Sequence, residues 1–402
     1  MPVSSTCTAW LLQLNLFFVG ITLSQAFIAP SFPASARPCG AAPRFSPKAQ
    51  CLDRRRLLLS PLVEGTRRVL TGPRGVHAVS LSGEPLGYQD LDLLLGGESI
   101  PISVWYPPED GGSAVAGAAK YPHKISVGKI TTLLTRGSLK APEFLGPSTT
   151  LAGEAQLKKG ASPQPGLPAI IFCHGYLGSR FDMLHVCEAL ASKGFVVAAP
   201  ELPESLSAGF TPNDDTTRTA IVEATINLLN RNWKISDKVG LFGHSAGGGT
   251  STMMPGSFSL GRVAIAGFRG YAGSDRLLVI ASKGDGIIPV KGIEAALPAG
   301  CSIYREEEGA KEFISKGLGG GKSAALLFEK GIGQAPLPPN HISFLSEPTN
   351  DALVTFLSPL LPVARILDVP VLDFDKYQEA RDSRETAKAF IPVVLSFFEG
   401  AK

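Results

Sequence analysis

Residues 238–249 read KVGLFGHSAGGG, which combines an apolar run with a serine between glycines. A short apolar run ends at Gly243, and small residues follow Ser245. The pattern Gly-x-Ser-x-Gly is typical of a nucleophile elbow, in which a strand turns sharply into a helix and holds the serine in a strained conformation. Side chains two residues before or after the serine would collide in that turn, so Gly243 and Gly247 are required. The sequence predicts a nucleophilic Ser245 above a sheet; a plain Gly-rich turn is the alternative.

Apolar runs of strand type alternate with helical patterns on both sides of this elbow. Strands are expected at residues 91–95, 100–106, 169–173, 195–200, 238–242, 262–266 and 277–282. Helical spacing of apolar residues covers residues 181–193 and a segment that begins at Asp214-Asp215 and ends near Asn232. The alternation predicts an α/β protein with a mostly parallel central sheet, flanked by helices. The first two strands are expected to form a hairpin.

The apolar run at residues 169–173 ends in His174-Gly175-Tyr176. A His-Gly pair after a strand, upstream of a nucleophile elbow, is where such a fold builds half of its oxyanion hole. The backbone N–H of Tyr176 would then donate beside that of Ala246. An ordinary strand-end turn is the alternative, and His174 itself is interpreted as structural.

The general base follows from chain order. Serine is a poor nucleophile at its free pKa and needs an adjacent base that a carboxylate orients. After a nucleophile elbow the acid comes next in the chain and the histidine last. Only His341 of the six histidines follows Ser245, so His341 is the predicted base. His244 precedes the serine and is expected to point away from it.

The acid is less constrained, because several aspartates follow the serine. Asp285 is preferred because it comes directly after the apolar run at residues 277–282. This position is at the carboxyl edge of a parallel sheet, the same edge as the elbow. Asp275 is the runner-up. A turn aspartate that only accepts local backbone N–H bonds is the alternative interpretation of Asp285.

Composition excludes several classes of protein. The formal net charge of +3 is too small to indicate nucleic acid binding. Cys173, Cys187 and Cys301 have neither C-x-x-C spacing nor an even number, so neither a metal site nor a disulfide framework is expected.

One long segment lacks a clear period. Residues 111–167 are rich in Gly, Ala, Pro, Ser and Lys and are too long for an ordinary loop. They are interpreted as a solvated insertion before the oxyanion strand. Attraction of its lysines to anionic lipid is the alternative.

The N-terminal region has the composition of a targeting segment. Residues 1–36 carry no charge and contain an apolar block too short for a typical membrane span, which resembles a signal peptide. The following residues are rich in Pro, Ala, Ser and Arg, as in transit peptides. The junction QAFIAP at residues 25–30 resembles the phenylalanine-containing junction of bipartite presequences in algae with secondarily acquired plastids. We expect a plastid address; a secreted or endomembrane protein, or an uncleaved anchor, is the alternative.

From about residue 90 onward the chain resembles an α/β-hydrolase. AIIFCHGYLG (169–178) and ASKGFVVAAPEL (191–202) resemble plant chlorophyllase. ISVWYP (102–107), the long insertion and the elbow resemble platelet-activating-factor acetylhydrolase of the secreted type, and cutinase-like esterases share the same core. Both branches place the acid one strand earlier, where this chain has Ala266-Gly267-Phe268-Arg269-Gly270. An acid at Asp285 instead resembles dienelactone-hydrolase-like members.

The resemblance implies a serine carboxylic-ester hydrolase that cleaves a lipid-like ester, such as a phospholipid or another acyl lipid, through an acyl-enzyme. Hydrolysis of the phytyl ester of chlorophyll is the alternative substrate. A non-catalytic hydrolase-fold binding protein is the alternative of another class, and an acyltransferase or thioesterase would use the same triad. No cofactor and no metal are expected, and the expected partner is a small-molecule ester, with peripheral membrane contact left open. The expected organisation is a signal-peptide-like segment (1–26), a disordered transit-like segment (27–60), a lead-in (61–88) and the catalytic domain (89–402).

Overall fold

A computed structural model gives the fold of the chain. It describes residues 84–109, 115–126, 128–129, 145–207, 210–271, 273–316, 322–357 and 383–402. The signal-peptide-like segment, the transit-like segment and most of the lead-in expected from the sequence lie outside the described residues. Among those that are described, no helix is both long and apolar enough to span a bilayer.

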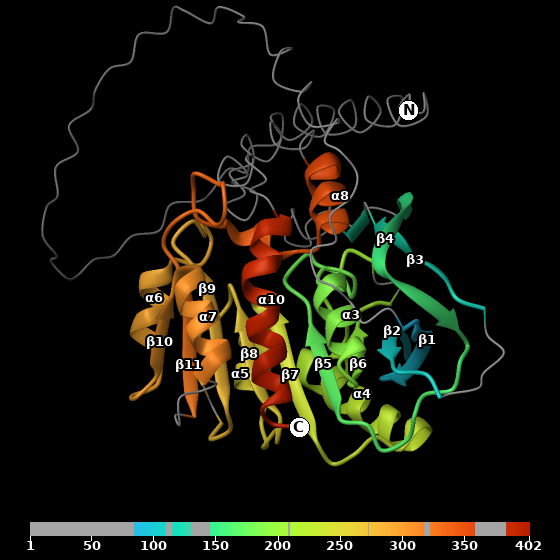
Figure 1. Ribbon diagram of the computed structural model, residues 1–402. Helices are drawn as coiled ribbons and strands as arrows, with labels where there is room; N and C mark the ends of the chain where they lie inside the picture. Colours follow the sequence, from blue (N-terminus) through green and yellow to red (C-terminus); the bar gives the residue numbers. More distant parts are fainter. Residues whose placement is uncertain are drawn as a thin grey trace, which may run out of the picture. The chain divides into compact units, whose positions relative to one another are not determined.

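The described elements are organised around a single 11-stranded sheet (Figure 1). In spatial order its strands are β10 (Ser302–Arg305), β11 (Ser323–Phe328), β9 (Leu277–Ser282), β8 (Gly261–Ile265), β7 (Val239–His244), β5 (Ala169–Cys173), β6 (Val196–Pro200), β2 (Glu98–Tyr106), β1 (Leu86–Leu95), β4 (Leu145–Lys159) and β3 (Gly117–Ser126). Every neighbouring pair from β10 to β6 is parallel, whereas β2 runs antiparallel to β6 and to β1. The predicted α/β class, with a mostly parallel sheet flanked by helices, is confirmed.

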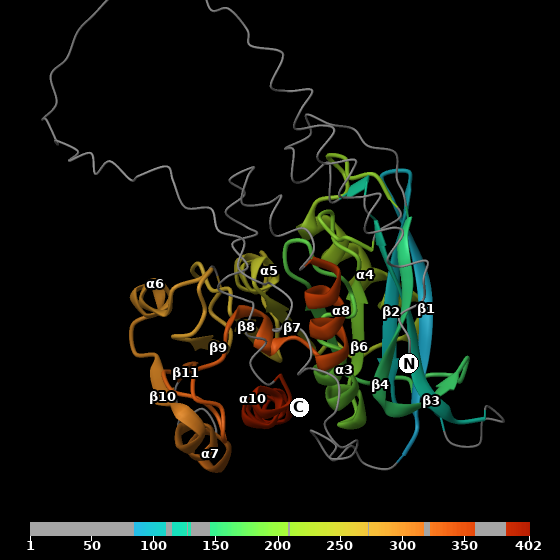
Figure 2. The ribbon, with the colours of Figure 1, turned by 90° about the horizontal axis from the view of Figure 1, so that it is seen from above.

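Helices cover both faces of the parallel part of the sheet. The described helices are α3 (Leu184–Ser192), α4 (Arg218–Trp233), α5 (Ala246–Met253), α6 (Val290–Ala296), α7 (Glu306–Lys316), α8 (Glu347–Leu357) and α10 (Ser383–Glu399), with a 3₁₀ helix η2 (His341–Phe344). Helix α8 packs against β4 and α10. Figure 2 shows α3, α7 and α10 on one side of the sheet and α4, α5 and α6 on the other. Side chains of a strand alternate between faces. Ile170 and Phe172 accordingly belong to the core under α3 and α10, and Ile171 and Cys173 to the core under α4.

The predicted hairpin at the start of the domain is confirmed as β1 and β2. Gly96 and Gly97 form its two-residue turn with φ of 58° and 80°, a conformation that favours glycine. Strand β1 begins at Leu86, so the last residues assigned to a loosely ordered lead-in are in fact part of the sheet.

The solvated insertion expected at residues 111–167 is corrected for its described part, which forms β3 and β4. Buried and exposed residues alternate along β3, with Ala119 and Tyr121 inside and Lys120 outside. The strands pair antiparallel and extend the sheet beyond β1. Tyr121 also donates a hydrogen bond of 2.6 Å to Glu188 of α3, which fastens the hairpin to the domain. The Gly, Ala and Pro residues in these strands obscure the alternation of apolar and polar residues by which a strand is predicted from sequence.

The predicted helix start at Asp214-Asp215 is wrong by a few residues. The side-chain oxygen of Asn213 accepts the N–H groups of Asp215 and Thr216, which forms a local turn before the helix. Helix α4 begins only after Thr217, whose hydroxyl accepts the N–H of Ala220 as an N-cap.

Candidate active site

Ser245 occupies the sharp turn between β7 and α5. Its backbone has φ 55° and ψ −124°, a conformation that L-residues rarely adopt and that costs roughly 1–3 kcal/mol. A Cβ on Gly243 would lie 2.1 Å from the carbonyl oxygen of Gly247, and one on Gly247 would lie 1.8 Å from that of Cys173. No flexible side chain could relieve either clash, because both neighbours are backbone. The turn therefore has the geometry predicted for a nucleophile elbow and admits only glycine at these two positions.

Two further glycines lie against the serine, and the sequence pattern did not indicate that either one contacts it. A Cβ on Gly175 would lie 3.1 Å from the Cβ of Ser245. A Cβ on Gly267 would lie 1.8 Å from the carbonyl oxygen of Ser245. Gly267 belongs to the turn after β8, where the acetylhydrolase and chlorophyllase branches are expected to carry their acid. In this chain that turn packs tightly under the nucleophile.

The structure brings Asp285 and His341 together from the ends of β9 and β11. Oδ2 of Asp285 lies 2.7 Å from Nδ1 of His341, and both side chains are buried. Oδ1 of Asp285 accepts the backbone N–H groups of Ile287 and Ile288 at 2.8 and 2.9 Å. The local-turn interpretation of Asp285 and its predicted contact with the base therefore both hold, one for each oxygen. With Nδ1–H donated to the carboxylate, Nε2 of a neutral His341 is left as the acceptor.

A capping box fixes the backbone of His341. The side-chain oxygen of Asn340 accepts the N–H of Ser343 at 2.9 Å, and the Ser343 hydroxyl oxygen accepts the N–H of Asn340 at 3.1 Å. This reciprocal pair begins the 3₁₀ helix η2 with His341 as its first residue. The orientation of the imidazole is thus set both from its backbone and from Asp285.

Asp275, the runner-up acid, lies elsewhere. It precedes β9 rather than following it, and its Oδ2 accepts bonds of 3.0 Å from both the N–H of Phe258 and Nε of Arg262. The guanidinium of Arg262 is fully buried and also donates to several carbonyls at the C-terminal end of α5 and just beyond. Asp275 therefore neutralises a structural arginine at the amino edge of the sheet.

The predicted oxyanion turn lies directly beside the nucleophile, through the contact of Gly175 with Ser245. Among the described residues, no acceptor is recorded for the backbone N–H groups of Tyr176 and Ala246. Ala246 is the first residue of α5, where such a group has no partner within the helix. Both amides are available to an oxygen that approaches Ser245.

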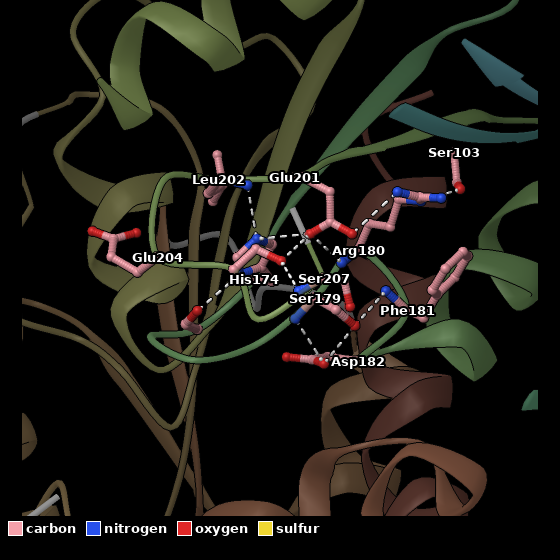
Figure 3. A network of polar contacts seen from close by, with 12 residues as sticks. Ser103, His174, Ser179, Arg180, Phe181, Asp182, Glu201, Leu202, Glu204 and Ser207 are labelled. Carbon is pink, nitrogen blue, oxygen red and sulfur yellow. Dashed lines mark hydrogen bonds and ion pairs between the residues drawn. The ribbon is translucent and has the colours of Figure 1, made fainter. Parts of the chain in front are cut away.

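His174 has the structural role expected for it (Figure 3). Its Nε2 accepts the N–H of Leu202 at 2.8 Å, and its Nδ1 lies 2.8 Å from the carbonyl oxygen of Gly175. Burial lowers the pKa of His174 to about 3, which keeps the ring neutral, as these two bonds require. The ring of His174 therefore connects the oxyanion turn to Leu202, which follows β6, and stabilises the turn.

Charged groups support the same turn. Arg218, at the start of α4, donates to the carbonyl oxygen of His174 at 3.0 Å and to the hydroxyl of Thr250 in α5 at 3.3 Å. Arg180 pairs with the fully buried Glu201 at 3.2 Å (Figure 3). The guanidinium of Arg218 thus links the oxyanion turn to α5, the helix that follows Ser245.

His244 departs from the sequence-based expectation. Instead of pointing away from the site, its buried ring lies 4.8 Å from the ring of His341 between centroids, and its Nε2 lies 2.9 Å from the carbonyl oxygen of His341. A contact across 97 residues has no sequence signal of its own. No cluster of three metal-ligating side chains is present within the described parts of the chain.

Comparisons with known proteins agree with this picture in part. A family model described as platelet-activating factor acetylhydrolase, isoform II, matches residues 144–233, which include the oxyanion turn but end before Ser245. A search of curated proteins finds no match. Four solved structures that resemble the chain share 12–18% identity with it.

All four are hydrolases or esterases by their descriptions. A ferulic acid esterase from Streptomyces cinnamoneus has 18% identity and a TM-score of 0.32 over 55% of this chain and 71% of its own. A putative dienelactone hydrolase from Klebsiella pneumoniae has 12% identity and a TM-score of 0.35 over 68% and 98%. An esterase from Pyrococcus furiosus has 12% identity and a TM-score of 0.33 over 72% and 96%.

Proposed function

We propose that this chain is a serine hydrolase of carboxylic esters, with Ser245 as nucleophile, His341 as general base and Asp285 as the acid that orients it. The hydrogen bond between Asp285 and His341 carries the proposal, because it forms at the sheet edge where the strained Ser245 also lies. Three strand ends far apart in sequence converge there in the order that a serine triad requires. The partial match to an acetylhydrolase family supports the same class of reaction.

The proposed mechanism uses only these groups. Nε2 of His341 takes the Ser245 proton as Oγ attacks the ester carbonyl, and the N–H groups of Tyr176 and Ala246 bind the resulting oxyanion. Collapse expels the alcohol, which takes the proton from His341. A water molecule, deprotonated by His341, then attacks the acyl-enzyme. Collapse of this second intermediate returns the proton from His341 to Oγ of Ser245 and releases the carboxylic acid.

A lipid-like ester is the proposed substrate, consistent with a small-molecule partner and peripheral membrane contact. Large apolar side chains are exposed on the segments that carry the site, namely Tyr176 (42% exposed), Ile287 (39%) and Leu337 (43%). Tyr176 follows strand β5, Ile287 follows Asp285, and Leu337 precedes His341. These apolar side chains would favour an apolar acyl or alcohol group in the substrate. We further propose that the protein acts in a plastid, on the composition of its first sixty residues.

The test is hydrolysis of p-nitrophenyl butyrate by wild type, Ser245→Ala and Ser315→Ala. Ser315 is an exposed serine of α7 and serves as the matched control. We expect activity to disappear in Ser245→Ala alone; unchanged hydrolysis in that variant would favour the non-catalytic alternative. A panel of short-chain acyl phospholipids, plastid galactolipids and chlorophyll then distinguishes substrates. Release of chlorophyllide alone would overturn the acyl-lipid proposal.

A further inference from the structure

The imidazole of His244 bridges the two halves of the proposed site. It is buried between the oxyanion turn and the base, since a Cβ on Gly175 would lie 3.5 Å from Nδ1 of His244 while Nε2 contacts the carbonyl oxygen of His341. Because His244 directly precedes Ser245, this hydrogen bond joins the chain segment of the nucleophile to the backbone of the base.

The protonation state of His244 is determined by its surroundings. Burial, followed by the neighbouring His341, lowers the pKa of His244 to about 3, so the ring is neutral at physiological pH. A neutral imidazole has one N–H, and a carbonyl oxygen can only accept. The bond to His341 therefore needs the proton on Nε2, which makes His244 a donor there.

The restraints on His341 come from three directions. Asp285 contacts Nδ1 of the ring. The capping box between Asn340 and Ser343 restrains the backbone on both sides of His341. His244 holds the carbonyl oxygen. The contact of His244 connects the base to the chain segment that carries the nucleophile, so it restrains the base relative to Ser245.

We propose that His244 is a positioning residue, whose Nε2–H bond to the His341 carbonyl sets the distance between base and nucleophile. The inference rests on the proposed serine hydrolase function. A displacement of a catalytic group by about 1 Å can cost roughly 100-fold in rate. Loss of this one bond should therefore lower kcat and leave KM, which reflects the apolar surroundings of the ester, within about twofold.

The experiment compares His244→Gln, His244→Asn and His244→Met. The amide nitrogen of glutamine can reach the place of Nε2, that of asparagine reaches only the place of Nδ1, and methionine fills the volume without a donor. We expect kcat for p-nitrophenyl butyrate to fall about 10- to 100-fold in the Asn and Met variants and to be retained within a few-fold in the Gln variant. Labelling of Ser245 by a fluorophosphonate should likewise be slowed in the Asn and Met variants and remain close to the wild-type rate in the Gln variant.

His185→Gln is the matched control, because His185 is another buried histidine, packed edge-on against Phe390 and outside the site. It should leave kcat unchanged. Melting temperatures identify any variant that fails to fold, and the Gln and Asn pair keeps the test decisive if Met does not fold. Equal activity of all three His244 variants, or equal loss in Gln and Asn, would overturn the positioning role. Activity that survives in Ser245→Ala would instead overturn the proposed function, whatever His244 does.

Discussion

Two aspartates at opposite ends of β9 show how differently the two edges of this sheet are used. Asp275 precedes the strand and neutralises the buried Arg262. Asp285 follows the strand and contacts His341. Both are carboxylates within three residues of the same apolar run, and each accepts backbone N–H bonds as well as its side-chain partner. The groups of the proposed triad lie at the carboxyl edge, where every parallel strand ends, whereas the Asp275–Arg262 pair at the amino edge supports the fold.

The largest effect is expected for Asp285→Asn. The amide oxygen should stay with the N–H groups of Ile287 and Ile288, which turns the NH2 group toward Nδ1 of His341. A donor there selects the wrong imidazole tautomer and cannot stabilise its charged form, so kcat should fall roughly 10³- to 10⁴-fold, with little change in melting temperature. Steady-state kinetics with p-nitrophenyl butyrate measures this change. An activity within tenfold of wild type would remove Asp285 from the site.

A backbone substitution tests the elbow itself. Gly247→Ala should cost about 3 kcal/mol or more of unfolding free energy, because its Cβ would lie 1.8 Å from the carbonyl oxygen of Cys173. Gly292→Ala in α6 is the control, since a Cβ there meets nothing within 4 Å. Denaturant titration compares the two, and equal stabilities would contradict the tight approach of β5 to α5.

The opposite result is expected at the amino edge. Asp275→Asn leaves the guanidinium of Arg262 buried without its counter-charge, which should lower the unfolding free energy by about 3 kcal/mol. The kcat per folded molecule should stay close to that of wild type. A large fall in kcat with unchanged stability would reverse the roles that the structure gives to the two aspartates.

A smaller effect depends on pH. Burial raises the pKa of Asp182, near the oxyanion turn, to about 7, although bonds from Ser179 oppose the shift. Between about pH 4 and 7 the folded protein keeps a proton that the unfolded chain has lost, so stability falls progressively across this range and levels off above about pH 7. Asp182→Asn should therefore flatten the fall in melting temperature between pH 5 and 8. Parallel curves for variant and wild type would contradict the shift.

The sequence predicted those parts of the molecule that depend on local pattern. The apolar runs before Gly175, Ser245 and Asp285 are short central strands, and chain order leaves His341 as the sole histidine after the serine. The contacts of Asp285 with both His341 and its own turn agree with the prediction of its position, while its catalytic role stays a prediction.

The remaining features depend on proximity that no local pattern records. Gly267 and His244 matter through what they touch, namely Ser245 and the backbone of His341. The β3–β4 hairpin was missed because its buried residues include Ala and His among exposed Lys and Pro, which blurs the alternation of a strand. These contacts and this strand pairing can be predicted only when the order of strands in the sheet is known, because that order brings distant strand ends to one edge.

The central claim is that Ser245 forms an acyl-enzyme with the help of His341, and mass spectrometry tests it most directly. Wild-type protein quenched during turnover of p-nitrophenyl butyrate should gain one butyryl group on the peptide that contains Ser245. Ser245→Ala should gain none, and His341→Gln should acylate far more slowly. A butyryl group on another residue, or turnover by Ser245→Ala at the wild-type rate, would contradict the account.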